Sequence, residues 1–416
     1  MYNIEIMYNK LNYIIGYLFF FVVFLLLQYS EGFPPIRGLS IAQLWKMFVL
    51  LWFFYILFKY DRKWFPFEKI SYLCSVLCFL CPAIVSDPFS IVIHASKQLP
   101  MVLFFHFWIA RYSKKQNVLE TILYSLAQYI SILSLVCLLG IVRPVVSYKS
   151  ADAYGESMEY YSALFGAVHA ASSYFCIALF ILLYGFKNGR FVKKTQKIYN
   201  AFLIVVLLFS LYKSFVRTGW LMFGIGCFFM FFNREDFNVK KILRYAIIVT
   251  SVVIGGYWQF QNNSSLKARI TERTVYNKSG EVKINGSGRF TFWTISLTKY
   301  MENDAYGLLF GKGINAAKDD MADVLGHRLV SHNHFIDTLS QYGIVGLVLL
   351  VLYFYAIYRF IIRYGRGSPY QRLSKIIFMA YVIFAFFQNE MYFWYAALFA
   401  VTLALMYMSG SQDTIK

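Results

Sequence analysis

The chain has 416 residues, of which 59% are hydrophobic, 20% aromatic and only 15% charged, and its mean hydropathy is +0.53. A soluble chain is about 45–50% apolar, and a globule of this length cannot hide so large an excess. Soluble enzymes, disordered chains and secreted disulfide scaffolds are therefore excluded, and the composition predicts a membrane protein. The 40 Lys and Arg residues exceed the 21 Asp and Glu residues. They lie in short clusters between apolar stretches, which is typical of membrane orientation and argues against a nucleic-acid partner.

Apolar runs that are long enough to span a bilayer, or nearly so, recur along the whole chain. A spanning helix needs about 20 such residues, so the two shortest runs, 219–232 and 376–388, must borrow flanking residues. We therefore expect an all-α, polytopic integral membrane protein with about twelve transmembrane helices. The expected spans are 11–29, 41–58, 70–85, 91–110, 118–142, 163–186, 198–216, 219–232, 242–258, 335–358, 376–388 and 391–408.

The basic residues test this arrangement independently, because Lys and Arg concentrate in cytoplasmic loops. If residue 1 is cytoplasmic, five basic clusters all fall on the cytoplasmic side, at 59–69, 111–115, 187–197, 234–244 and 359–375. The short loops on the opposite side hold only Arg37, Arg143, Lys149 and Arg217. We therefore expect both termini in the cytoplasm.

One long polar segment divides the chain. The expected organisation is transmembrane helices 1–9 in residues 1–258, a large outer loop in 259–334, and transmembrane helices 10–12 in 335–416. A loop longer than about 60 residues is translocated largely regardless of its charge. This loop is the only place where a small subdomain outside the membrane could form.

The large loop is expected to contain a helix. It opens with a flexible polar stretch, and a helical apolar pattern follows from Arg289 to about Asn303. Trp293, Leu297 and Tyr300 mark the predicted apolar face of this helix.

Three polar elements are predicted to meet at the outer membrane surface. Arg217 follows the span at 198–216, with Lys213 one turn below it, Arg289 opens the loop helix, and His332 and His334 precede the span at 335–358. Each residue alone also fits a structural explanation, such as a guanidinium that reaches the headgroups or an ordinary loop charge. Their common position is what favours a site.

In this order the elements resemble the bacterial O-antigen polymerase and O-antigen ligase family of membrane glycosyltransferases. The resemblance covers about residues 213–346. It is carried by the motif VRTGW at 216–220, by Gly288-Arg289 followed by Trp293, by the Gly311-x-Gly313 turn, and by His332-Asn333 ahead of Gly343 and Gly346.

The resemblance implies a GT-C-like fold in a bacterial inner membrane and a site at the periplasmic face. It implies a glycan donor linked through pyrophosphate to a polyprenol such as undecaprenol, whose leaving group Arg217 and Arg289 bind. His332 is the expected general base and His334 the reserve, in an inverting transfer that needs no cofactor and no metal. Membrane lipids and a chain-length regulator protein are the other partners that the family implies. Substrate-binding positions of lower rank are Lys213, His334, Lys97, Arg143, Trp293 and Asp337.

Alternatives remain at the sequence level. A polymerase is preferred to a ligase that uses lipid A-core, because polymerases are the more diverse class, and a flippase of lipid-linked oligosaccharides is the more distant alternative. The pattern Asp319-Asp320-Met321-Ala322-Asp323 fits a magnesium motif, but a solvated acidic helix turn is favoured. His94, His106 and His169 are expected mainly as buried core residues, and Glu390 as a partner of a cation.

Overall fold

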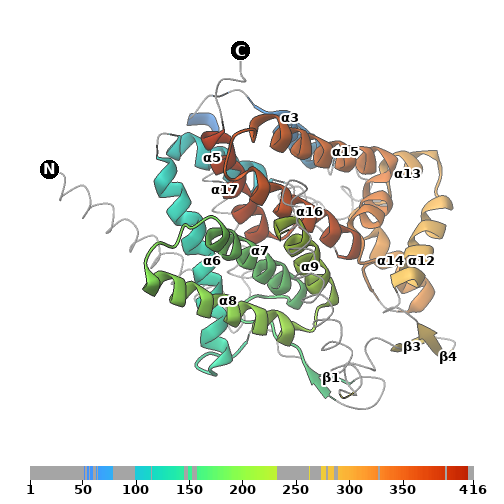
Figure 1. Cartoon of the computed structure of the whole chain (residues 1–416). Coiled ribbons are helices and arrows are strands. Elements are labelled where there is room, and N and C mark those ends of the chain that lie inside the picture. Colours follow the sequence, from blue (N-terminus) through green and yellow to red (C-terminus); the bar gives the residue numbers. More distant parts are fainter. Residues whose placement is uncertain are drawn as a thin grey trace, which may run out of the picture.

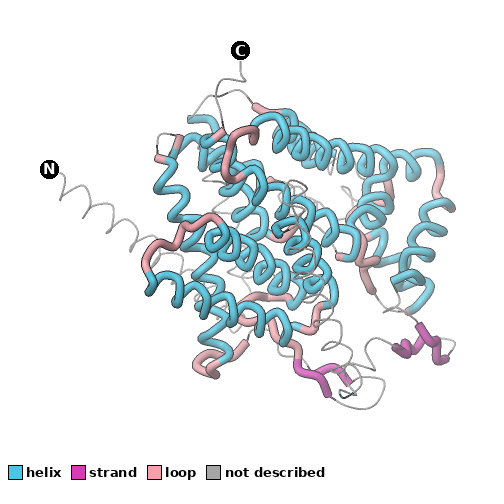
Figure 2. Tube along the Cα trace, in the orientation of Figure 1, coloured by secondary structure: helices cyan, strands magenta, loops and turns pink. Residues whose placement is uncertain are grey.

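The computed structural model describes parts of 51–77, then 99–113, 115–144, 149–151, 157–231, 262, 273–277, 280–284, 289–326, 328–388 and 391–410. Within these residues the chain is predominantly helical (Figures 1 and 2). The helices are α3 (Pro66–Leu77), α5 (Pro100–Tyr112), α6 (Gln116–Leu138), α7 (Val168–Lys187), α8 (Lys194–Ser214), α9 (Arg217–Phe231), α12 (Arg289–Met301), α13 (Ala305–Phe310), α14 (Ala316–Leu325), α15 (His334–Tyr364), α16 (Gln371–Phe387) and α17 (Phe393–Ser409).

Two short antiparallel hairpins complete the described elements. Strand β1 (Lys149–Ala151) pairs with β2 (Ser157–Glu159), and β3 (Arg273–Asn277) pairs with β4 (Gly280–Ile284). The second hairpin lies in the stretch of the large loop that the sequence predicted to be polar and flexible. Both hairpins are additions to the expected all-helical fold.

Four helices, α6, α7, α8 and α15, are long and apolar enough to cross a membrane. They coincide with the predicted spans at 118–142, 163–186, 198–216 and 335–358. The shorter helices α9, α16 and α17 coincide with the predicted spans at 219–232, 376–388 and 391–408. The predicted spans at 11–29 and 242–258 lie outside the described residues, so the count of about twelve stays a prediction.

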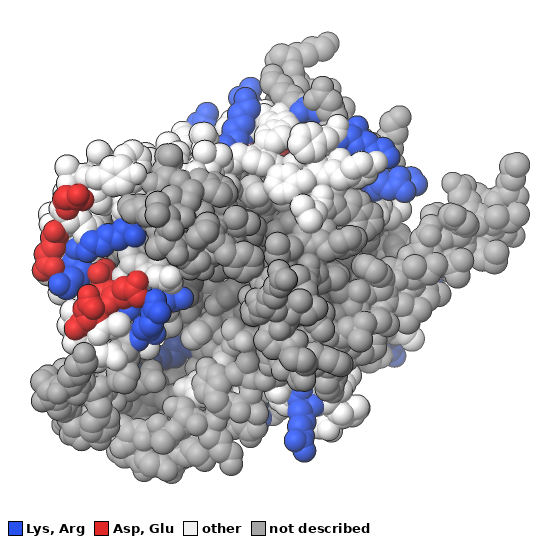
Figure 3. Space-filling model, turned by 180° about the vertical axis from the view of Figure 1, so that it is seen from behind, with Lys and Arg blue, Asp and Glu red and all other residues white. Residues whose placement is uncertain are grey.

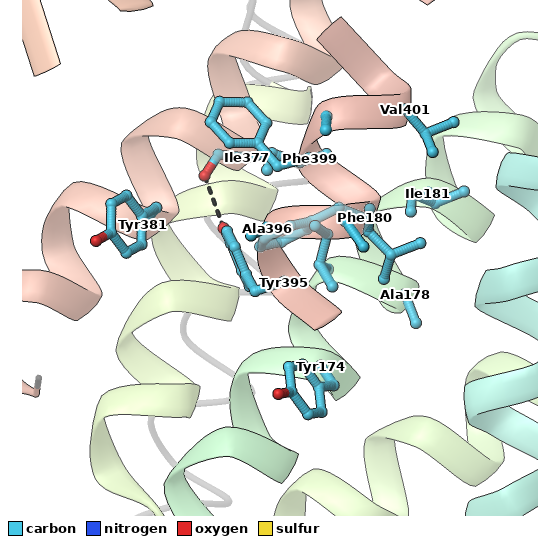
Figure 4. Close-up of a cluster of buried hydrophobic side chains, with 14 of the residues drawn as sticks. Tyr174, Ala178, Phe180, Ile181, Ile377, Tyr381, Tyr395, Ala396, Phe399 and Val401 are labelled. Atoms are coloured by element: carbon cyan, nitrogen blue, oxygen red, sulfur yellow. Dashed lines mark hydrogen bonds between the residues drawn. The ribbon is translucent and has the colours of Figure 1, made fainter. Parts of the chain in front are cut away.

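Helix α7 occupies the centre of the described bundle. It is buried along almost its whole length, whereas only 33% of the apolar window is buried in α8 and in α15, as expected of helices that face lipid. At Gly226 of α9 a Cβ atom would come within 2.2 Å of the Phe180 ring of α7, so the glycine permits this close approach. Figure 4 shows the packing around Phe180 and Tyr395, whose hydroxyl donates to the Ile377 carbonyl oxygen at 2.8 Å.

The helix ends that carry basic clusters meet at one end of the bundle. Arg190 Nε, after α7, lies 3.2 Å from Oε1 of Glu120, near the start of α6. The guanidinium of Arg372, at the start of α16, donates to the Phe229 carbonyl oxygen at the end of α9. This grouping agrees with the alternation from which the cytoplasmic side was predicted.

In the large loop, the predicted helix is present as α12, but its buried face differs from the prediction. Phe292 and Tyr300 are buried, whereas Leu297 is 42% exposed. The reason is the neighbouring helix: Phe292 packs with Met321 and Leu325 of α14, and this contact fixes the rotation of α12. Trp293 is half-buried at the edge of the same face.

A glycine pair joins the loop to α15. The backbone of α15 breaks at Gly343, which has a φ of 66°, and the loop passes so closely that a Cβ there would lie 2.3 Å from the Leu309 carbonyl carbon. The amide of Lys312 donates to the Ser340 carbonyl oxygen at 3.1 Å. Gly311, with a φ of 75°, has equally little room. The predicted glycine turn therefore anchors the loop against the start of α15.

Candidate functional site

Arg289 reaches from the loop to α9. Its Nη2 atom lies 3.4 Å from Oγ1 of Thr218, the residue after Arg217. Burial, and next the positive charge of Arg217, lower the pKa of Arg289 to about 10. The two guanidiniums therefore lie close enough to repel each other, although 71 residues separate Arg289 from Thr218 in the chain. The structure brings the two predicted arginines together.

The end of α16 completes the surroundings of Arg289. The guanidinium carbon lies 5.7 Å from the centre of the Phe387 ring, a cation–π geometry. Gln388 is buried, and its Nε2 atom lies 3.5 Å from Thr218 Oγ1. Sequence reasoning missed both residues. The available signal was the amide of Gln388 at the end of an otherwise apolar run.

The segment that carries His332 is held in a defined conformation. Trp293 Nε1 donates to the Ser331 carbonyl oxygen at 3.0 Å, and the Ser331 amide donates to Asp337 Oδ1 at 3.3 Å. Asn333 caps α15, since its Oδ1 accepts from two backbone amides of the first turn at 3.0 and 3.2 Å. His332 itself has a φ of 56°, which is uncommon for a residue other than glycine and is typical of functional segments.

A second histidine faces this segment. The rings of His169 and His332 have their centres 5.9 Å apart and are inclined by 60°. His169, in the first turn of α7, also interacts electrostatically with Arg289. The sequence favoured a buried core role for His169. Its ring is largely buried, but it lies against the candidate site.

Helix N-termini and basic side chains make the site electropositive. Helices α7, α9, α12 and α15 all begin here, with His169, Arg217, Arg289 and His334 at their first or second positions. Helix N-termini carry partial positive charge and bind anions. Together with the two guanidiniums they suit a ligand with several negative charges.

The other predicted positions are more scattered. His334 and Asp337 are buried at the start of α15. Lys213 and Arg143 are exposed, and among the described residues the structure shows no contact between them and Arg289 or His332. Lys97, His94 and Glu390 lie outside the described residues.

Two of the three carboxylates of the α14 acidic pattern lie near basic residues. Asp319 Oδ1 lies 2.6 Å from Arg328 Nη2, and Asp320 Oδ1 lies 4.0 Å from Lys312 Nζ. Figure 3 shows acidic and basic side chains mixed on one part of the surface. Asp320 is buried, which the prediction of a fully solvated turn did not include. Within the described part of the chain, no group of three His, Cys, Asp or Glu residues could hold a metal ion.

These features describe an α-helical protein with helices long and apolar enough to cross a membrane, and with an electropositive, histidine-containing cluster at one end of its bundle. Residues 202–351 match the model of the Wzy_C family, which is described as O-antigen ligase. The match supports the resemblance to the O-antigen polymerase and ligase family, whose members are glycosyltransferase-like enzymes. The matched segment includes Arg217, Arg289 and His332. No curated protein matches the chain.

Proposed function

We propose that this protein transfers a glycan from undecaprenyl pyrophosphate to the hydroxyl group of an acceptor sugar. One observation carries the proposal: Arg289 lies beside Arg217 and close to the His169–His332 pair. Arg217, Arg289 and His332 fall within the segment that matches the family.

The arginines account for the leaving group. Cleavage of the sugar–phosphate bond places negative charge on the lipid pyrophosphate, which needs charge stabilisation more than it needs a proton. Guanidinium groups stay charged and bind phosphate oxygens in pairs. A bound pyrophosphate also relieves the repulsion between Arg217 and Arg289 that lowers the pKa of Arg289. We propose that these charges make a metal ion unnecessary.

His332 is the proposed general base. The acceptor oxygen forms a bond to the anomeric carbon while the bond from that carbon to the phosphate oxygen breaks, and its electron pair leaves with the pyrophosphate. The hydroxyl proton passes to His332, a group suited to this task near neutral pH. Direct attack inverts the anomeric centre, and no covalent sugar–enzyme intermediate is required. His334 remains the reserve base.

The proposed acceptor is the terminal sugar of another carrier-linked repeat unit, which makes the enzyme a polymerase of surface polysaccharide. The description of the matching family as O-antigen ligase supports a second candidate, a ligase that transfers the same donor to lipid A-core. In either case we place the enzyme in the bacterial inner membrane, with its termini in the cytoplasm and its site at the periplasmic face. Membrane lipids and a chain-length regulator protein are the proposed partners.

Reconstitution tests the proposal. The full chain in lipid nanodiscs is incubated with a synthetic undecaprenyl pyrophosphate-linked repeat, with and without lipid A-core and with and without a chelator. A polymerase gives a ladder from the carrier-linked repeat alone, whereas a ligase gives product only when lipid A-core is present. Chelation leaves either activity unchanged. Absence of transfer to both acceptors by folded protein contradicts the proposal, and movement of the intact donor across a vesicle membrane would identify a flippase.

A further inference from the structure

His169 is a titratable group of the site that the reaction above does not use. It lies in the first turn of α7, the most buried helix of the described bundle. Its Nδ1 atom is buried and has no hydrogen-bond partner among the described residues. A buried polar nitrogen without a partner is costly. The conventional explanation, a core histidine satisfied by its neighbours, therefore does not account for it.

The charges that face His169 favour its neutral form. Arg289 approaches from α12 and His332 from the segment before α15, and Arg217 of α9 lies next to Arg289. The carboxylate in the first turn of α15 is Asp337, which accepts from the Ser331 amide. A buried imidazole among cations remains neutral, so that one of its ring nitrogens can accept a hydrogen bond.

We propose that His169 is a positioning residue that accepts a hydrogen bond from His332 when His332 takes the proton of the acceptor hydroxyl. The proposal rests on the glycosyl transfer proposed above. The ring separation of 5.9 Å is longer than in a formed hydrogen bond between imidazoles. Such bonds commonly shorten when substrate binds.

The step balances without a further reactant. The acceptor oxygen gives its electron pair to the anomeric carbon, and its proton moves to one nitrogen of His332. The second N–H of the resulting imidazolium donates to the neutral nitrogen of His169. The pair thus holds one added proton, which passes to water before the next turnover. His169 orients the His332 ring and stabilises the charged form of His332. In catalytic triads a carboxylate has this role toward the catalytic histidine.

Substitutions of His169 separate this role from simple packing. His169→Leu removes the acceptor and should lower kcat about 10–100-fold, as expected when a hydrogen bond to a charged group is lost. Because that bond forms in the substrate complex and favours protonated His332, its loss should also move the acid limb of kcat to lower pH by about one unit. His169→Asn and His169→Gln place an amide oxygen near one or the other ring nitrogen. One of them should restore most of the rate and the position of the limb.

The matched control is Ser173→Ala, one turn further along α7, where the hydroxyl bonds only within its own helix in the described structure. This variant should behave like the wild type. All variants are purified as full chains, checked for folding by thermal unfolding, and assayed between pH 5 and 9 with the carrier-linked repeat. A His332→Gln variant is measured in parallel and should lose about 10²–10⁴ in rate.

The outcomes distinguish the two levels of the proposal. Absence of transfer by folded wild-type protein would refute the proposed function itself. If His332→Gln is impaired but His169→Leu keeps the wild-type rate and acid limb, only the role of His169 is refuted. The same holds if His169→Leu raises the donor KM while the acid limb stays in place, because His169 would then bind the donor instead.

Discussion

Replacing Arg289 by Gln should make the ligand-free protein more stable while it removes most of the transferase activity. In the folded chain, burial and the charge of Arg217 lower the pKa of Arg289 to about 10. Because the pKa of this base is lower in the folded state than in the unfolded one, charging Arg289 costs stability. The full cost is present below about pH 10 and is relieved as the pH rises above that value. At neutral pH, Arg289→Gln therefore removes a destabilising charge.

The size of the effect follows from the contacts of Arg289. The lowered pKa corresponds to about 3 kcal/mol against the charged form, and partial exposure to water reduces this cost. The variant also loses the Phe387 contact at 5.7 Å, which is worth about 0.5–1 kcal/mol. A net gain of about 1–2 kcal/mol remains. Loss of one pre-positioned donor to the leaving group should lower kcat by about 10²–10³.

The assay is thermal unfolding of the purified full chain at pH 7, with and without inorganic pyrophosphate, together with transfer kinetics. Pyrophosphate should stabilise the wild type, because a ligand that binds only the folded state raises its stability, and should stabilise Arg289→Gln much less. The control is Arg328→Gln, which removes an exposed arginine of the same loop that pairs with Asp319. This control should change neither property much. A less stable Arg289→Gln variant with normal transfer would refute the reasoning.

Two further predictions concern the loop. Gly343→Ala should abolish folding, because the φ of 66° and the Leu309 carbonyl leave no room for a Cβ atom. Gly224→Ala, where a Cβ meets nothing within 4 Å, should fold normally by size-exclusion chromatography, and equal behaviour of the two would contradict this explanation. The double variant Asp319→Asn and Asp323→Asn should keep a transfer rate within about twofold of the wild-type rate, with or without chelator. The reason is that arginines supply the positive charge that binds the pyrophosphate. A loss above tenfold that added magnesium reverses would instead support a metal site.

Much of the helical framework was predictable because apolar runs of spanning length leave few alternatives. The runs at 118–142 and 198–216 became α6 and α8 within a few residues. The meeting of Arg217 and Arg289 was predictable for a related reason: alternation of the basic loops puts both on one side of the membrane.

The remaining features depend on tertiary contacts. Phe292 and Leu297 each belong to a possible apolar face of a helix with 3.6 residues per turn. The packing of Phe292 on Met321 of α14 decides which of the two residues is buried. His169 and Gln388 look like isolated polar residues in apolar runs, because their partners lie on other helices. The β3–β4 hairpin was recognisable in the sequence, because segments of alternating polar and apolar residues flank a turn that ends at Gly280.

The central claim is that Arg217 and Arg289 bind the donor pyrophosphate while His332 takes the acceptor proton. Donor affinity and single-turnover transfer, measured on the same preparations of Arg217→Gln, Arg289→Gln and His332→Gln, test it most directly. The account predicts weaker donor binding for both arginine variants, and normal donor binding with almost no transfer for His332→Gln. Transfer at the wild-type rate by His332→Gln, or unchanged binding and transfer in the arginine variants, would contradict it.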